Sequence, residues 1–238
     1  MPSIASLLLA LVLPAPALDA AHTVDGVTPG SVSVPTQAQV TQDPVATPDP
    51  VLEWRTATDG NEARYRVREQ LARLNFPNDA VGASSEVEGR LAMTPDGRID
   101  AGNSGFTIGL AALTSDSDRR DNFLRRNTLS TDDHPEAHFQ PREFRGLDVS
   151  TILEAGASNG DAATLEFEIV GDLTIRGVTR QTTWAVQAEL AGESIRGRAE
   201  TRFTFGDFDL TVPSVGSVLS INDDIRLELD FFLVPAGR

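Results

Sequence analysis

The chain has 238 residues, 40% of them hydrophobic, which is enough for one all-β domain with additional segments and excludes global disorder. The absence of cysteine excludes disulfides, thiolate metal ligands, cysteine nucleophiles and acylation of a lipoprotein cysteine. The net charge of −15 repels nucleic-acid phosphates and anionic lipid headgroups, so we expect no nucleic-acid partner and no peripheral binding to anionic lipid.

The N-terminal residues 4–18, IASLLLALVLPAPAL, form an apolar run that ends among small residues. This pattern predicts a secretory signal peptide over residues 1–21, because the run is too short and too interrupted by Pro to span a bilayer. The start of the run lacks Arg and Lys, so a buried N-terminal segment stays open as the alternative. With the signal peptide we expect a periplasmic or secreted location and no stable insertion into a membrane.

Residues 22–50 are rich in Pro, Thr, Val and Asp, contain no Arg and show no sustained periodicity. Such a composition predicts a flexible arm without a packed core. The first arginine is Arg55, and we expect the folded domain to cover residues 51–238.

The first part of this domain alternates apolar and polar residues and predicts strands at 51–58 and 87–93. Residues 65–74 begin with the same alternation and then lose it, so strand and helix both stay open there. Residues 98–113 are expected to return as one strand, because the segment Thr94-Pro95-Asp96-Gly97 has the chemistry of a turn.

One helix is predicted, over residues 116–129. Ser115 and Asp118 are interpreted as a capping box at its start, and Phe123 and Leu124 supply a narrow apolar stripe. The helix also carries four arginines that we expect to face solvent: Arg119, Arg120, Arg125 and Arg126.

The strongest β pattern lies in residues 165–190, which predict two long strands folded back on each other. Large apolar residues alternate with polar ones in both arms, as in a strand with one buried face. The short link Arg176–Arg180 contains Gly, as a hairpin turn requires. Further strands are predicted at residues 137–139, 143–147, 194–210 and 225–233.

The pattern therefore amounts to about eight strands and one helix, without a βαβ rhythm or a fixed-period repeat. Eight alternating strands close well into an up-and-down barrel, because closure removes the exposed sheet edges. We predict an all-β fold, an eight-stranded antiparallel barrel with one short helix. On the pattern alone a two-sheet sandwich stays open, and the interior of a barrel is either filled or holds one elongated ligand.

Six segments of the domain, in this order, resemble the motifs of the YceI-like family of lipocalin-like barrels. Its members bind polyisoprenoid lipids. GDLTIRGVT is the most specific of the six, and the segment 204–208 departs from the Arg-Ser-Asp-Phe-Gly that is usual in the late strand. The segments are YRVREQL (65–71), VGASSEVEGRL (81–91), LTSDSDRRDNFL (113–124), HPEAHFQP (134–141), GDLTIRGVT (171–179) and FTFGDFDLTVP (203–213).

The resemblance implies an extracytoplasmic lipid-binding or lipid-transfer protein that holds a long isoprenoid-type chain, a polyprenyl phosphate or an isoprenoid quinone, in the barrel lumen. It also makes Arg120 the candidate contact for a phosphate head group, the alternative being an Arg–carboxylate pair that closes one end of the barrel. For each lumen candidate the alternative is ordinary core packing. These candidates are Phe106, Ile108, Phe139, Phe167, Ile169, Trp184, Val186, Phe203, Phe205, Leu227 and Leu229.

We expect no catalytic residue, no metal site and no cofactor, with bound isoprenoid lipid as the ligand. His134 and His138 have a helical ligand spacing, but Pro135 disfavours a helix there. The segment 103–105 lacks the flanking pattern of a nucleophile elbow. The expected partner is a long-chain apolar lipid, and the protein is a monomer or a homodimer. The alternative from another class is a filled barrel that acts as a non-catalytic envelope stress or adhesion module.

Overall fold

The computed structural model describes residues 52–150, 152, 162–214 and 216–237. The predicted signal peptide, residues 1–21, and the predicted arm, residues 22–50, lie outside these described residues. Within the described ranges, no helix combines the length and the apolar character needed to cross a bilayer.

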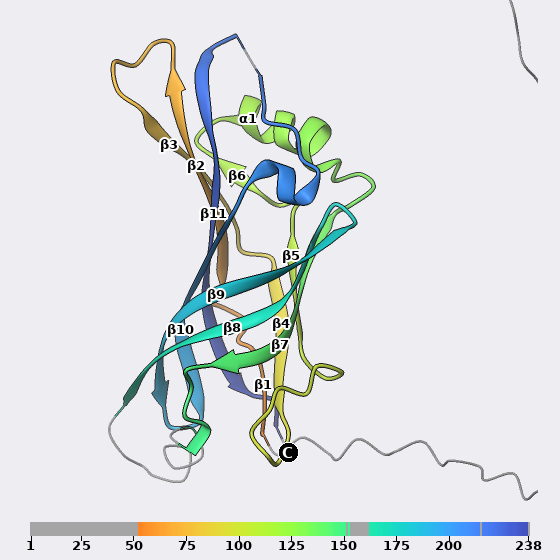
Figure 1. The fold of residues 1–238 in the computed structure, drawn as a ribbon, viewed down its shortest axis with the longest axis vertical. Coiled ribbons are helices and arrows are strands. Elements are labelled where there is room, and N and C mark those ends of the chain that lie inside the picture. The colour runs from red at the N-terminus through yellow and green to blue at the C-terminus, as the bar shows by residue number, and fades with distance from the viewer. Residues whose placement is uncertain (1–51, 151, 153–161, 215, 238) are drawn as a thin grey trace, which may run out of the picture. The chain divides into compact units, whose positions relative to one another are not determined.

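The described residues form a closed antiparallel barrel of eight strands, as predicted (Figure 1). The order is β1-β4-β5-β7-β8-β9-β10-β11, and β11 pairs back with β1. Three of the eight strands are interrupted, so that β2, β3 and β6 continue β1, β4 and β5. The segments are β1 Leu52–Thr56, β2 Glu62–Leu71, β3 Asn78–Ser84, β4 Val87–Met93, β5 Gly105–Gly109, β6 Thr114–Ser115, β7 Glu136–Arg145, β8 Ala163–Ile175, β9 Val178–Ala191, β10 Ser194–Phe203 and β11 Val218–Pro235.

The closing contact joins the first and last strands, with Trp54 opposite Pro235 and Thr56 opposite Leu233. Where β1 gives way to β2, the side chain of Asn61 replaces the backbone ladder. Its Oδ1 accepts from Phe232 N at 2.9 Å, and its Nδ2 donates to the Ala57 carbonyl at 2.7 Å. This closure excludes the two-sheet sandwich.

The structure corrects the strand predicted over residues 98–113. Only Gly105–Gly109 forms a continuous strand there, because the Asp100 carboxylate accepts the backbone N–H groups of Gly102 at 3.0 Å and Asn103 at 3.3 Å. This local turn competes with the sheet ladder.

The strand predicted over residues 194–210 also ends early, at Phe203. A 3₁₀ helix, η2 (Phe205–Phe208), follows it, and the side chains and backbones of Thr204 and Asp207 cap each other reciprocally at its start. The two strands predicted at 137–139 and 143–147 are one strand, β7, with a bulge between Pro141 and Glu143. Pro lacks the N–H that a regular ladder needs, so a bulge accommodates it.

β3 has no counterpart among the predicted strands. Its buried face carries Ala80, Gly82 and Ser84, small residues with little β propensity. The ring of Tyr65, opposite Gly82 in the neighbouring strand, covers this face, and a Cβ at Gly82 would lie 2.3 Å from Tyr65 Cε1. Of the segment 65–74, which stayed open between strand and helix, residues 65–71 belong to the strand β2 and residues 72–74 lie in the loop that follows it.

The predicted helix is present as α1 (Asp118–Phe123), which continues into a π-helical segment, η1 (Leu124–Leu129). Its N-cap is Ser117, whereas the hydroxyl of Ser115 donates to Asp121 at 2.6 Å, so the predicted capping box is wrong. Arg119 and Arg126 are exposed as expected. In contrast, Arg120 turns toward β2, and Arg125 donates to the Leu113 carbonyl at 2.9 Å.

The long hairpin predicted over residues 165–190 is formed by β8 and β9. Its turn is tighter than expected, because only Arg176 and Gly177 separate the strands, both with positive φ, 50° and 77°. Two residues in this conformation match the twist of the flanking strands.

Candidate functional site

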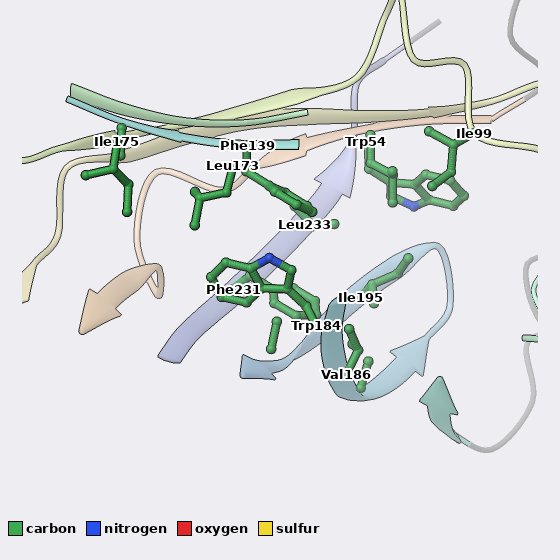
Figure 2. Packing of buried hydrophobic residues seen from close by; sticks show 14 of the residues in the cluster. Trp54, Ile99, Phe139, Leu173, Ile175, Trp184, Val186, Ile195, Phe231 and Leu233 are labelled. Atoms are coloured by element: carbon green, nitrogen blue, oxygen red, sulfur yellow. The ribbon is translucent and has the colours of Figure 1, made fainter. Parts of the chain in front are cut away.

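The inward faces of the strands enclose an apolar cavity of about 200 Å³. All eight strands of the closed barrel contribute to its lining, and Leu124 and Leu129 beside α1 border it at one end. Figure 2 shows Phe139, Leu173 and Trp184 pointing into the interior from β7, β8 and β9. The cavity is therefore a lumen that extends through the barrel core.

Strand alternation explains why these side chains share the lumen. In β8 the odd-numbered positions from Leu165 to Ile175 point inward, and the register places Ile169 opposite Trp184. Aromatic side chains then pack along the wall. The rings of Phe139 and Trp184 lie 5.5 Å apart, and those of Phe144 and Phe167 lie 5.7 Å apart.

Ten of the eleven candidate lumen residues border this cavity, and Val186 is the exception. Val186 is only 2% exposed, but it lies in the wall without bordering the cavity. The ten are Phe106, Ile108, Phe139, Phe167, Ile169, Trp184, Phe203, Phe205, Leu227 and Leu229.

Sequence reasoning missed lining residues of three kinds. Leu124 and Leu129 lie in the helical segment, where strand alternation does not apply. Leu113 and Leu147 lie at the ends of the strands predicted over residues 98–113 and 143–147, but outside the observed β5 and β7. Other missed residues share the inward parity of the residues that were named, so the same alternation would have found them. Examples are Leu165, Leu173, Ile175, Ile225, Phe231 and Leu233.

The free volume is smaller than the roughly 300–1,000 Å³ that is typical of small-molecule pockets. Aromatic rings take up part of the interior. For example, Phe106 lies over Gly89 on the opposite strand, where a Cβ would meet Phe106 Cδ1 at 2.1 Å. A ligand longer than the free space would thus require side-chain movement along the lumen.

A polar cluster lies between α1 and the barrel. Arg120 Nη2 is 3.0 Å from Glu69 Oε1, and Nη1 contacts Asp116 and lies 3.2 Å from Ser115 Oγ. Hydrogen bonding from Arg120 lowers the pKa of Asp116. Since Glu69 and Asp116 already neutralise Arg120, a phosphate that binds its remaining N–H groups would gain less from the positive charge.

Tyr65 lies next to this cluster. Burial raises the pKa of its phenol to about 12, so the group stays neutral. Its buried hydroxyl has no hydrogen-bond partner within the described part of the chain. Nearby, Ser115 Oγ donates to Asp121 at 2.6 Å and accepts from Ser117 N and Arg120 Nη1, both at 3.2 Å.

The described residues contain no group of three or more His, Cys, Asp or Glu residues that could hold a metal ion. The exposed His138 ring contacts Thr107 Oγ1 at 3.2 Å and lies 3.8 Å from Glu136. The sequence has one Gly-x-Ser-x-Gly segment, residues 156–160, and it lies outside the described residues.

The family model described as the YceI-like domain matches residues 54–233, which extend from β1 to β11. The chain belongs to the YceI-like family. The match includes the lumen wall and the α1 cluster of this YceI-like protein, and the resemblance noted in the sequence is confirmed. A comparison with curated proteins gives no match.

Solved structures share this fold. A polyisoprenoid-binding domain from Saccharophagus degradans, implicated in plant cell wall breakdown, has a TM-score of 0.57 at 13% identity, covering 77% of this chain and 99% of its own. BcnA from Burkholderia cenocepacia has a TM-score of 0.51 at 13% identity, with 72% and 95% covered. The YCEI protein of Campylobacter jejuni has a TM-score of 0.50 at 17% identity, with 71% and 91% covered.

Proposed function

We propose that this YceI-like protein binds a long-chain apolar lipid of the isoprenoid type in its barrel and carries it outside the cytoplasm. The observation that carries the proposal is the lumen itself, lined by apolar side chains from all eight strands. The similarity to a polyisoprenoid-binding domain supports the choice of ligand class.

An apolar tail needs no polar recognition in such a lumen. Each buried methylene contributes roughly 0.8 kcal/mol, so a tail with many methylenes binds through its length alone. Polar groups at the lumen ends would then orient the ligand without supplying most of the affinity. A polyprenyl phosphate and an isoprenoid quinone both carry such an apolar tail.

The free volume of about 200 Å³ favours the second candidate, a filled barrel that acts as a non-catalytic envelope module. For the lipid-binding function, side chains along the lumen must change rotamer as the chain enters. The two functions therefore differ in one observable, the presence of a bound apolar molecule.

Native mass spectrometry and lipid extraction of the protein from its own host would test the proposal. Ala199 faces the lumen from β10, and Ala185 is exposed on the neighbouring β9. We expect Ala199→Phe to lose most of the bound molecule and Ala185→Phe to retain it. A wild-type extract without any long apolar molecule would leave the filled barrel as the better account.

The location outside the cytoplasm rests on residues 1–21 and is tested separately. We expect N-terminal sequencing of the protein recovered from a periplasmic or culture-medium fraction to begin near His22. Recovery of the intact N-terminus from the cytosol would contradict export without affecting lipid binding.

A further inference from the structure

Large exposed hydrophobic side chains gather where β2, β3 and β11 meet. Leu74 (41% exposed) and Phe76 (79%) lie in the loop between β2 and β3, and Leu219 (68%) lies at the start of β11. The loop and the start of β11 are neighbours, because Leu71 pairs with Val218 and Ala72 N donates to Ser217 O at 3.0 Å. We refer to Leu74, Phe76 and Leu219 as the hairpin tip. Figure 1 shows the loop between β2 and β3 and the start of β11 at the end of the barrel that carries α1.

The loop of the hairpin tip also carries no negative charge of its own. The loop residues 72–77 contain a single charged residue, Arg73, although the whole chain has a net charge of −15. At the base of the loop, Arg68 pairs with Asp79 at 3.0 Å. The exposed Asp116 beside α1 pairs with Arg120, whose hydrogen bond lowers the pKa of this carboxyl, and Arg73 of the loop adds to the effect. The loop can therefore approach a surface of zwitterionic lipid without bringing a negative charge of its own to it.

The backbone of the loop is partly satisfied from within, as insertion into an apolar phase requires. Gln70 Nε2 donates to the Leu74 carbonyl at 2.7 Å and to the Leu71 carbonyl at 3.1 Å, and Leu74 N donates to Leu71 O at 3.1 Å. These bonds lower the cost of removing the loop from water.

A protein partner fits this feature less well. The three side chains expose on the order of 400 Å², whereas a stable protein interface buries roughly 800 Å² on each partner. A bilayer needs neither that area nor a complementary shape. Since burial of one large side chain changes an equilibrium constant about 10-fold or more, three partly inserted side chains suffice for reversible attachment.

From these observations we propose that the hairpin tip inserts into the surface of a zwitterionic lipid bilayer and docks the barrel there. The docking rests on the proposed function in one respect: the bilayer surface that the hairpin tip contacts is where an apolar cargo would be taken up or released. The docking itself depends on Leu74, Phe76 and Leu219 and not on the lumen.

Sedimentation with phosphatidylcholine vesicles tests the docking. We expect the double variant Phe76→Asn/Leu219→Asn to bind about 100-fold more weakly than the wild type, at about 10-fold for each side chain. The matched control Phe76→Leu keeps an apolar tip and should bind nearly as the wild type does. Thermal unfolding would verify that both variants remain folded, as is expected for such exposed positions.

A second readout follows the tip directly. We expect the tryptophan emission of Phe76→Trp to shift to the blue when phosphatidylcholine vesicles are added, while the wild type, whose Trp54 and Trp184 are buried, shows little change. Replacing part of the lipid with phosphatidylglycerol should weaken binding because of the negative charge of the protein.

Three results would overturn the docking proposal. These are equal vesicle binding by the wild type and the double variant, binding that requires phosphatidylglycerol and disappears with salt, or a change of oligomeric state in the double variant without vesicles. Failure of the proposed function is distinguishable, because native mass spectrometry would then find no apolar molecule in wild type or variant, whatever their vesicle binding.

Discussion

The guanidinium of Arg120 on α1 lies 3.0 Å from the carboxylate of Glu69 on β2, although 51 positions separate the two residues in the sequence. Glu69 has the inward parity of Tyr65 and Val67, and its side chain is only 6% exposed. A carboxylate that is buried at the end of an apolar lumen requires a cation. The pair therefore attaches the helix to the barrel and neutralises this charge.

Removing the cation should destabilise the barrel. We expect Arg120→Met to lower the free energy of unfolding by about 3 kcal/mol, because it leaves the Glu69 carboxylate buried without its partner. The double variant Glu69→Gln/Arg120→Met should lose clearly less than the sum of the single variants. Urea denaturation measures both quantities, and Arg119→Met on the exposed side of α1 is the control. Additive losses would show that the two residues act independently.

The same Arg120→Met variant tests the head-group candidate. Because Arg120 already pairs with Glu69 and Asp116, we expect the variant, if folded, to bind a polyprenyl phosphate and the corresponding uncharged polyprenol with unchanged relative affinity. A selective loss of affinity for the phosphate, measured by titration calorimetry, would assign the head group to Arg120.

A surface network on β10 and β11 predicts a dependence of stability on pH. Arg198 holds the Asp230 carboxylate through two hydrogen bonds of 2.6 and 3.0 Å, and this lowers the pKa of Asp230, with Arg64 adding to the effect. A carboxyl whose pKa is lower in the folded protein stabilises it above the unfolded pKa, and this contribution is lost as pH falls through the folded pKa.

We therefore expect Asp230→Asn to cost about 1 kcal/mol of unfolding free energy at neutral pH, a modest value because the group is partly exposed. The difference from the wild type should shrink below about pH 4, the unfolded value for Asp. Urea denaturation across this range measures it. Asp224→Asn, in an exposed ion pair with Arg202, serves as the control. A difference in unfolding free energy that stays constant with pH would contradict the lowered pKa of Asp230 in the folded protein.

The turn between β8 and β9 makes a prediction about backbone strain. Gly177 has φ +77°, and a Cβ there would meet no atom closer than 3.5 Å, so strain rather than collision sets the cost. We expect Gly177→Ala to lower the unfolding free energy by roughly 1–2 kcal/mol. Arg176→Asn, at φ 50°, should be neutral or stabilising, since Asn tolerates this conformation. Urea denaturation measures both variants, and equal unfolding free energies of Gly177→Ala and the wild type would contradict this account of the turn.

The two tryptophans provide an optical test of lumen binding. Both border the cavity, and each indole N–H is engaged, Trp54 with the Glu193 carbonyl at 2.8 Å and Trp184 with Thr182 Oγ1 at 3.0 Å. We expect a brominated long-chain hydrocarbon to quench their fluorescence and its unbrominated counterpart not to. Trp54→Phe and Trp184→Phe should each retain part of the quenching. Unquenched emission at saturating ligand would contradict binding in the lumen.

Much of the lumen wall could be predicted from the local alternation of apolar and polar residues. Alternation in the segments that became β8, β9 and β11 correctly predicted most of the inward side chains, because successive residues of a strand point to opposite faces. Val170 and Glu228 are exceptions, since they have the opposite parity and are nevertheless buried. The helix was predicted for a similar local reason, whereas its cap was not. Several nearby serines and aspartates compete for the helix start, and in the structure the Ser117 hydroxyl accepts from Arg120 N while Ser115 donates to Asp121 instead.

Other features depended on contacts between distant segments. β3 became a strand because Tyr65 covers Gly82, and an inward glutamate was tolerated because Arg120 reaches it from α1. By itself the sequence determined the β class, the inward face of the long strands and the family. Only the tertiary structure decided closure through β1 and β11, the narrowness of the lumen and the exposure of the hairpin tip. The reason is physical: alternation specifies that a face is buried, while the residues that cover it come from segments whose positions depend on the register of the whole barrel.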